Sequence, residues 1–314
     1  MINRELLRIK VIQILYSYYQ SDSNSEKDAE KELFGSIGKT YELFHLLLLL
    51  AIDITRYAEE KIERGLNKFR PTHEELHPNP RFIVNAFVRQ LKINEALLTY
   101  AKEHKLSWSE QPELIKTLFE SIAVSDCYRE YMASKEKSYE EDKTVWRRIY
   151  NKVLLGNEDL DAVLEEMNVY WNDDVDIVIS FVIKALKRFE EKNKGKQGLL
   201  PMFKDEDDRL FVKKLFTDSI ANGNKYREII RRNITNWELE RVALMDIIIM
   251  QTALAELMSF PAIPVNVTLN EYIELAKTYS TERSGVFVNG VLNNVVNELR
   301  EEGKLVKAAS FNNN

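Results

Sequence analysis

The chain has 314 residues, of which 45% are hydrophobic and 30% are charged, with a formal net charge of −6 and a pI of about 5.5. This length and apolar content are enough to bury one large core or two smaller ones. Because the overall charge repels phosphate, any binding of nucleic acid requires a local basic patch. The single cysteine, Cys127, excludes an internal disulfide and a thiolate metal cluster, and we expect it to be a small buried hydrophobe.

The N-terminal residues MINRELLRIK carry charges where a secretory signal needs an apolar run. The apolar run FHLLLLLAI (44–52) ends at Asp53, well short of the roughly 20 apolar residues that a membrane span needs. We interpret this run as part of a buried core helix. The sequence therefore predicts a cytoplasmic protein without a membrane segment.

Gly and Pro are rare, and the stretches between them lack the alternation typical of strands, which predicts an all-α fold. The first expected helix covers residues 3–20. The second is capped by residues within 21–28 and continues to about 69, with a kink near Gly35 or Gly38. The remaining expected helices cover residues 81–104, 111–134, 139–155, 158–168, 172–193, 205–222, 224–234, 237–258, 266–279 and 284–302. The basic, glycine-containing connector KNKGKQGLLP (192–201) is the best candidate for a domain boundary. We expect the tail 304–314 to be disordered.

The segment PTHEELHPNP (71–80) contains His-Glu-x-x-His, the signature of a zinc peptidase helix, and Glu95 offers a third carboxylate. Zinc hydrolysis needs both histidines on one face of a stable helix. Pro78 follows His77 directly, and a residue before proline is pushed out of the α region. We therefore interpret the segment as a single turn capped by Thr72 in a surface linker, and expect no metal and no catalytic residues.

The helix expected at 237–258 is apolar almost all round, which predicts a central core helix. Asp246 is the exception, and should reach solvent or a partner because an unpaired buried carboxylate is costly. The last helix has a core stripe with spacings of three and four, at Val288, Val291, Leu292, Val295 and Leu299. Phe287 lies about 100° off this stripe in the first turn, where an aromatic ring suits base stacking and backbone N–H groups suit phosphate. The pattern alone favours a core position for Phe287.

The blocks MDIIIMQTALAEL, FPAIPVNVTLNEYIELAKTYS and FVNGVLN resemble, in order, spacing and length, the C-terminal half of the bacterial transcription antitermination factor NusB family. The first helix, NRELLRIKVIQILYSYYQ, is more weakly similar to the arginine-rich first helix of that family. The resemblance implies an all-helical, non-catalytic RNA-binding protein without a cofactor. It also implies pairing with NusE, a small-subunit ribosomal protein, to hold the boxA element of ribosomal RNA leaders on the elongating RNA polymerase.

The resemblance also assigns site residues, position by position. The implied RNA-binding residues are Arg4, Arg8, Tyr16, Phe287 and Asn289, and the implied partner-binding residues are Glu240 and Asp246. Arg4 and Arg8 are one helical turn apart on one face, which independently suits a phosphate clamp. The chain departs from the family at Val286 and Gln251, which replace basic residues, at Asn293, which replaces Asp, and at Arg283, which is basic where some members are acidic. The alternative function is a helical adaptor that binds protein and has little affinity for RNA.

Typical members of the family are about half as long as this chain. We therefore expect a NusB-like domain made of residues 1–69 and 201–303, interrupted by a helical insertion at 70–200. Within the insertion, LIKTLFESIAVSDCYREYM (114–132) resembles FVKKLFTDSIANGNKYREII (211–230), and Leu118-Phe119 matches Leu215-Phe216. We interpret this similarity as a degenerate internal duplication; the alternative is two amphipathic segments of similar composition.

Overall fold

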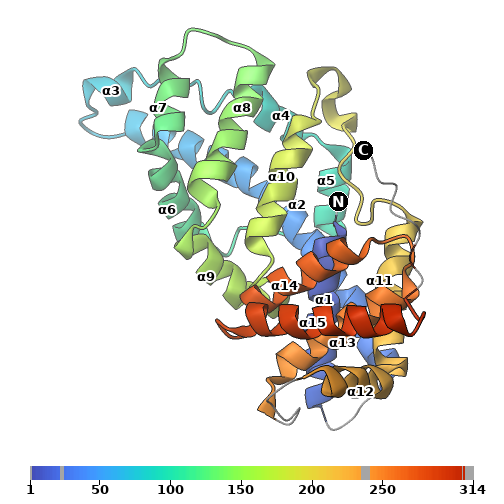
Figure 1. The fold of residues 1–314 in the computed structure, drawn as a ribbon. Coiled ribbons are helices and arrows are strands. Elements are labelled where there is room, and N and C mark those ends of the chain that lie inside the picture. Colours follow the sequence, from blue (N-terminus) through green and yellow to red (C-terminus); the bar gives the residue numbers. More distant parts are fainter. Residues whose placement is uncertain (1, 22–24, 235–240, 306, 308–314) are drawn as a thin grey trace. The chain divides into compact units, whose positions relative to one another are not determined.

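The computed structural model describes residues 2–21, 25–234, 241–305 and 307. Over these residues the expected all-α fold is confirmed, because the chain contains helices and an isolated β-bridge between Ile2 and Phe203 but no strand (Figure 1). The chain divides into two compact units: unit 1 is Gly38–Met202, and unit 2 is Ile2–Ile37 together with the chain from Phe203 onwards. The long helix α2 (Glu26–Leu66) contributes its first part to unit 2 and the remainder to unit 1, and it continues through Gly35 and Gly38.

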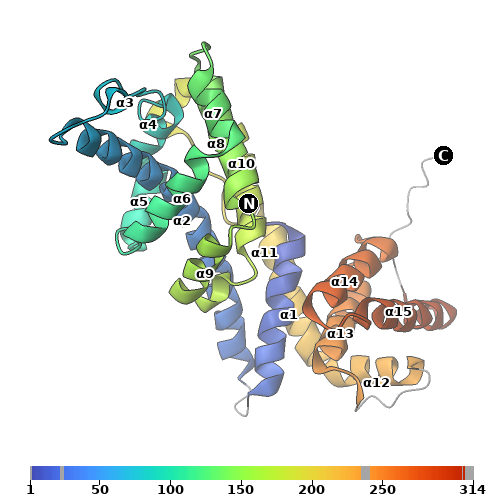
Figure 2. The same ribbon diagram turned by 90° about the vertical axis from the view of Figure 1, so that its left-hand side faces the viewer.

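Unit 2 is built around one helix. Besides the first part of α2, its helices are α1 (Arg4–Gln20), α11 (Glu206–Ala221), α12 (Gly223–Asn233), α13 (Leu244–Ser259), α14 (Val265–Tyr279) and α15 (Ser284–Glu301). Helix α13 contacts α1, α11, α12, α14 and α15 (Figures 1 and 2). Its apolar residues are buried on every side, among them Ile248, Met250 and Leu254. The prediction of a central core helix is therefore confirmed over the part that the structure describes.

Unit 1 packs short helices against the remainder of α2. These helices are α3 (His73–Leu76), α4 (Ala86–Lys92), α5 (Glu95–Glu103), α6 (Pro112–Ala123), α7 (Asp126–Ala133), α8 (Tyr139–Ile149), α9 (Glu158–Met167) and α10 (Val175–Lys187), with the π-helical turn η1 (Tyr150–Leu154) and the 3₁₀ segments η2 (Val169–Trp171) and η3 (Glu191–Lys196). The run 44–52 is buried within α2, and Cys127 is buried in α7, as expected. Among the described helices, none combines the length and the apolar content needed to cross a membrane.

Two helices expected from the apolar pattern are each divided by a capping residue. The helix expected at 81–104 is interrupted at Asn94, whose Oδ1 accepts a hydrogen bond from the N–H of Leu97 at 2.9 Å. The helix expected at 111–134 is interrupted at Ser125, whose Oγ caps α7. A side-chain oxygen that satisfies the free N–H groups of a new first turn favours a fresh start over continuation. The apolar period survives such a break, so the period alone did not reveal it.

The compact units do not follow the expected boundaries at one point. Residues 38–66 were expected to belong to the NusB-like part, yet they lie in unit 1 with the segment 70–200. The two similar segments both fold as helix pairs, α6 with α7 and α11 with α12. Leu118 and Phe119 are buried in the first pair, as Leu215 and Phe216 are in the second. This shared pattern of burial is compatible with the duplication, which stays a prediction.

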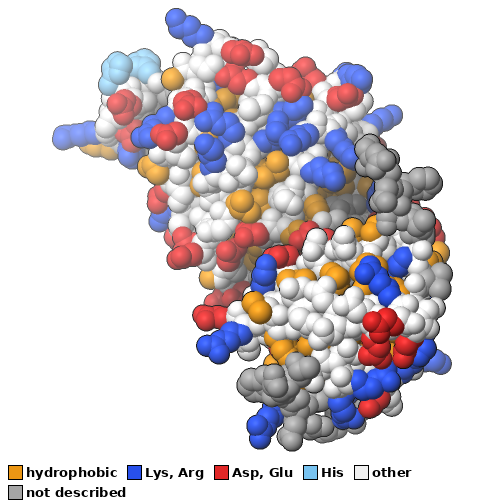
Figure 3. All heavy atoms as spheres, in the orientation of Figure 1, with side chains coloured by type: hydrophobic (Ala, Val, Ile, Leu, Met, Phe, Trp, Pro, Cys, Tyr) orange, Lys and Arg blue, Asp and Glu red, His pale blue; other side chains and the backbone are white. Residues whose placement is uncertain are grey.

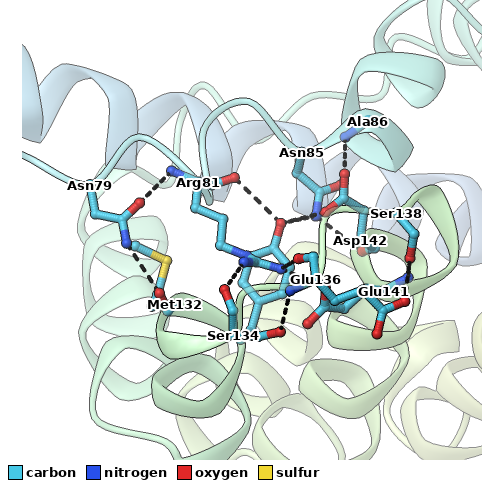
Figure 4. Close-up of polar contacts among 11 residues, drawn as sticks. Asn79, Arg81, Asn85, Ala86, Met132, Ser134, Glu136, Ser138, Glu141 and Asp142 are labelled. Atoms are coloured by element: carbon cyan, nitrogen blue, oxygen red, sulfur yellow. Dashed lines mark hydrogen bonds and ion pairs between the residues drawn. The ribbon is translucent and has the colours of Figure 1, made fainter.

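A polar network around Arg81 fixes the loop between α7 and α8 in unit 1 (Figure 4). The guanidinium of Arg81 donates to the backbone carbonyls of Ser134 and Glu136 and to Oε2 of Glu141 at 2.6 Å. It also lies over the ring of Tyr131, at 4.4 Å from the centroid. One side chain thereby satisfies several groups of a loop that has no secondary structure of its own.

Candidate nucleic-acid interface

The start of α15 is held by a cluster of small polar groups. The hydroxyl of Ser284, which is buried, donates to Oδ2 of Asp246 at 2.9 Å. Oγ of Ser284 also accepts a hydrogen bond from the backbone N–H of Thr281 at 3.1 Å and lies 2.8 Å from the Thr281 hydroxyl. Asp246 on α13 therefore fixes where α15 begins, and with it the direction of the first turn that carries Phe287.

A cavity of about 570 Å³ lies between the start of α13 and the start of α15. Its lining combines apolar groups with charges of both signs: Arg241, Val242, Ala243, Asp246, Thr281, Glu282, Arg283, Ser284, Val286 and Phe287. Val286 is among the most exposed apolar side chains of the chain, at 80%. An apolar wall next to arginines suits a ligand that has both a flat ring and a phosphate.

Phe287 lies at the edge of the core. It is half-buried and lines the cavity, whereas Val288 and Leu292 are fully buried. The remaining positions of the predicted stripe, Val291, Val295 and Leu299, are also buried, so the stripe is confirmed. Asn289 is exposed, and both its backbone carbonyl and its Oδ1 accept hydrogen bonds from Nδ2 of Asn293. The structure thus leaves the ring of Phe287 partly accessible.

Asp246 is 5% exposed, and its hydrogen-bond partner is the hydroxyl of Ser284, as expected for a buried carboxylate. Its second oxygen, Oδ1, is buried without a hydrogen-bond partner. A buried carboxylate with one unsatisfied oxygen is costly, and such groups are retained most readily at positions that serve a function. Glu240, the other acidic residue expected on the partner-binding face, lies outside the described residues.

Arg8 was expected to be an accessible phosphate ligand, and the structure places it in the core. Its side chain is 3% exposed. Its Nε and Nη2 donate to the two oxygens of Glu256 at 2.7 and 3.0 Å, and Nη1 donates to Glu271 at 3.1 Å. Burial opposes the charge, but the two carboxylates outweigh it and raise the pKa of the Arg8 guanidinium above its ordinary value. With its donors occupied, Arg8 is not presented to a phosphate in this structure.

The side chain of Arg4 remains partly exposed to solvent. Its side chain is 41% exposed, its Nε donates to Asp208 at 2.9 Å, and its guanidinium lies 4.8 Å from the centroid of Phe211. The guanidinium of Arg8 lies over the same ring at 5.5 Å, so the two arginines do share a face as expected. Tyr16, further along α1, is half-buried. The expected clamp is therefore reduced to one accessible cation.

Gln251 replaces a basic residue of the family and acts as a buried polar hub. Its Nε2 donates to the hydroxyl of Tyr19 and to the carbonyl of Ser219, both at 2.7 Å. Its Oε1 accepts from Nε of Arg227 at 3.0 Å, and this guanidinium stacks 4.3 Å from the centroid of the Tyr19 ring. A positive charge is therefore still present beside this position, contributed by α12. The polar pair Gln251-Thr252 within a largely apolar helix was the signal of it in the sequence.

The His-Glu-x-x-His segment folds as the expected capped turn. Helix α3 spans four residues and ends at Leu76, with His77 as its C-cap, and Oγ1 of Thr72 accepts from the N–H of Glu75 in a capping box. The carboxylate of Glu75 returns a bond to the N–H of Thr72 and pairs with Lys68. Among the described residues, no group of three or more His, Cys, Asp or Glu side chains is arranged to hold a metal ion. The interpretation of a surface turn is confirmed.

The fold and the site define an all-helical protein whose last helix begins at a cavity lined by apolar groups and by charges of both signs. The NusB family model matches residues 180–297. Proteins named transcription antitermination protein NusB are similar to the chain: that of Salinibacter ruber is 38% identical over 108 residues, which are 34% of this chain and 68% of that protein. That of Chloroherpeton thalassium is 36% identical over 123 residues, 38% of this chain and 58% of that protein. That of a Bacillus cereus strain is 39% identical over 94 residues, 30% of this chain and 72% of that protein.

These similarities show that the chain belongs to the NusB family. No solved structure matches the chain significantly. The matched region includes α13, α14 and most of α15, and so contains the cavity and the Ser284–Asp246 contact.

Proposed function

We propose that this protein is a non-catalytic transcription antitermination factor of the cytoplasm. It binds boxA-type single-stranded RNA of ribosomal RNA leaders together with NusE, and acts on the RNA polymerase elongation complex. The observation that carries the proposal is the position of Phe287: a family-matched aromatic ring, half-exposed in the first turn of α15, at the edge of a cavity that also contains two arginines.

The chemistry of this edge suits single-stranded RNA. A half-exposed ring offers a stacking surface for an unpaired base. The first N–H groups of α15 have no intrahelical partner and favour a phosphate, and no side chain caps them. Arg283 and Arg241 place two cations at the same cavity, alongside the carboxylates of Asp246 and Glu282. Glu240 is proposed to face NusE, and the buried Asp246 to contribute by positioning the start of α15. Arg4, Tyr16 and Asn289 are proposed to extend the RNA surface.

The direct test is a titration of the purified protein with boxA-type RNA, with and without its cognate NusE. We expect binding that is strengthened by NusE and lost when the boxA sequence is scrambled. Binding of NusE without any measurable affinity for RNA would instead favour the protein-binding adaptor. Binding of neither ligand would rule out the proposed function.

A further inference from the structure

The end of α10 and the segment η3 carry an unusual concentration of positive charge. Between residues 184 and 196 there are six cations, Lys184, Lys187, Arg188, Lys192, Lys194 and Lys196, and two anions, Glu190 and Glu191, a local net charge of +4. The whole chain has a net charge of −6. All six cations are exposed. We call these six residues the α10 basic surface.

Three of these cations lie on one side of α10. The helix buries Val178, Val182 and Leu186 on its inner face. Lys187 and the C-cap residue Arg188 lie three and four residues after Lys184, so each is a neighbour of Lys184 on the outer face, with Cβ atoms about 5–6 Å from that of Lys184. A row of cations at this separation can contact successive phosphates of one strand.

The cations of the α10 basic surface are largely free of acidic partners. Lys192 pairs with Glu190 at 2.9 Å, whereas Lys184, Lys187, Arg188, Lys194 and Lys196 form no ion pair with any described residue. Exposed cations of α6 and α7 behave differently, since Lys116 and Arg129 each pair with an acidic residue three positions away. The charge of the α10 basic surface is thus available to an external ligand.

Helix α8 extends this positive surface. It packs beside α10, and the two run next to each other in both ribbon views (Figures 1 and 2). It carries Arg147 and Arg148 in its last turn, followed by the exposed Lys152. Lys and Arg side chains gather over α8 and α10 on the face shown in Figure 3. Arg148 is itself paired with Glu130, and Lys143 is paired with Glu140, so the charge that this stretch adds to the positive surface comes from Arg147 and Lys152.

The chemistry of this surface selects the kind of partner. No large apolar side chain is exposed between residues 139 and 152 or between 184 and 196, all of which the structure describes. A protein hot spot or a membrane-binding face needs such apolar groups. The aromatic residues Trp146 and Tyr150 are buried, so no ring is available here to stack on a base. What remains is contact with a phosphate backbone, which does not depend on base sequence.

We propose that the α10 basic surface is a second, sequence-independent RNA-binding surface, which holds the phosphate backbone of the transcript outside the boxA-type segment. This inference rests on the proposed function, because it takes the ligand to be the same RNA. It gives unit 1 a role, namely to add affinity for RNA, because Arg8 of the expected first-helix clamp is buried in the core and is not presented to a phosphate.

The test compares the triple variant Lys184→Gln, Lys187→Gln, Arg188→Gln with a control, Lys102→Gln, Lys116→Gln, Lys135→Gln. The control removes the same charge from three exposed residues of unit 1 that are well separated in sequence: Lys102 on α5, Lys116 on α6 and Lys135 in the loop between α7 and α8. Two RNAs are titrated in the presence of NusE: a short RNA with only the boxA-type segment, and the same RNA lengthened on both sides by unstructured uridine tracts. Unchanged urea midpoints verify that both variants fold.

We expect the triple variant to lose affinity for the long RNA alone, with a log–log salt slope flatter by about 2, at about 0.7 per phosphate for three contacts. The short RNA should bind it as it binds the wild type, and the control should match the wild type on both. Equal behaviour of the triple variant and the control on the long RNA would overturn the inference, as would an equal loss on both RNAs. Failure of the wild type to bind the short RNA, with the triple variant still weakened on the long one, would reject only the boxA function.

Discussion

Arg8 on α1 and Glu256 on α13 form a two-pronged ion pair closed to solvent, with Nε–Oε2 at 2.7 Å and Nη2–Oε1 at 3.0 Å. The other acceptor sites of Glu256 are also used, since Thr268 donates to Oε1 at 2.8 Å and Tyr272 to Oε2 at 3.2 Å. Burial and the adjacent Glu256 charge raise the pKa of the Tyr272 hydroxyl well above its ordinary value. The pair therefore joins α1 to the central helix of unit 2 through a fully satisfied polar core.

Breaking this pair from one side should destabilise the protein. In Arg8→Met the carboxylate of Glu256 stays buried without its counter-ion, so the free energy of unfolding should fall by about 3–5 kcal/mol in urea titrations. The double variant Arg8→Met, Glu256→Leu leaves no buried charge and should lose less than the single variant. A double variant at least as unstable as the single one would show that the charge balance is not what matters here.

The face on which Arg8 lies could be predicted from the sequence, but the burial of its side chain could not. Spacing placed Arg4 and Arg8 on one face, and the structure confirms this, because both guanidinium groups lie over Phe211. Whether that face is open depends on what packs against it. The carboxylate that covers Arg8 lies 248 residues away in sequence, so no local pattern could reveal it. Helix periods, by contrast, are local, and the core stripe of α15 and the core helix α13 were predictable for that reason.

Arg4 should account for one phosphate contact. Arg4→Gln should weaken binding of boxA-type RNA and flatten the log–log salt slope by about 0.7. The matched variant is Asp208→Asn, which removes the carboxylate that now pairs with Nε of Arg4 at 2.9 Å. We expect it to tighten binding at low salt, because the guanidinium is released to the RNA. Identical salt slopes in Arg4→Gln and the wild type would exclude α1 from the RNA surface.

His45 should make the stability of unit 1 depend on pH. The residue is 2% exposed, its Nδ1 lies 2.8 Å from the carbonyl of Tyr41, and its ring stacks on Tyr100 at 3.8 Å between centroids. The pKa of its imidazole is lowered to about 4, mainly by burial and to a smaller extent by the charge of nearby His104, while the bond to the Tyr41 carbonyl opposes the shift. In the unfolded chain the pKa of His is about 6.5, so the unfolded state takes up the proton first as the pH falls. The stability that the neutral His45 side chain contributes is therefore fully present above pH 6.5 and is lost progressively as the pH falls towards 4.

Between pH 6.5 and pH 4 the free energy of unfolding should fall by about 3 kcal/mol, at about 1.4 kcal/mol for each pH unit. Urea titrations between pH 7 and pH 4 measure it. His45→Phe preserves the ring stack and removes the titrating group, so its pH dependence should be flatter than that of the wild type by this amount. His104→Gln serves as the control and should retain most of the dependence. Parallel curves for the wild type and His45→Phe would show that other groups cause the acid sensitivity.

Phe287 should act in RNA binding more than in folding. Its ring is half-buried at the cavity, off the buried stripe of α15, so truncation removes less packing than truncation of a core residue does. Loss of one stacking ring costs about 1–3 kcal/mol of RNA affinity. We therefore expect Phe287→Ala to weaken binding of boxA-type RNA by this amount in a titration, with a urea midpoint near that of the wild type and with NusE binding retained.

Leu292→Ala is the matched comparison, because Leu292 lies on the same helix, five residues further on, and is fully buried. It should lower the free energy of unfolding by about 2–5 kcal/mol while leaving the RNA affinity of the folded protein close to that of the wild type. The two variants thus separate stacking from packing on one helix. A large fall in the urea midpoint of Phe287→Ala, with a proportionate loss of every activity, would assign Phe287 to the core, and the RNA would then have to bind elsewhere on unit 2.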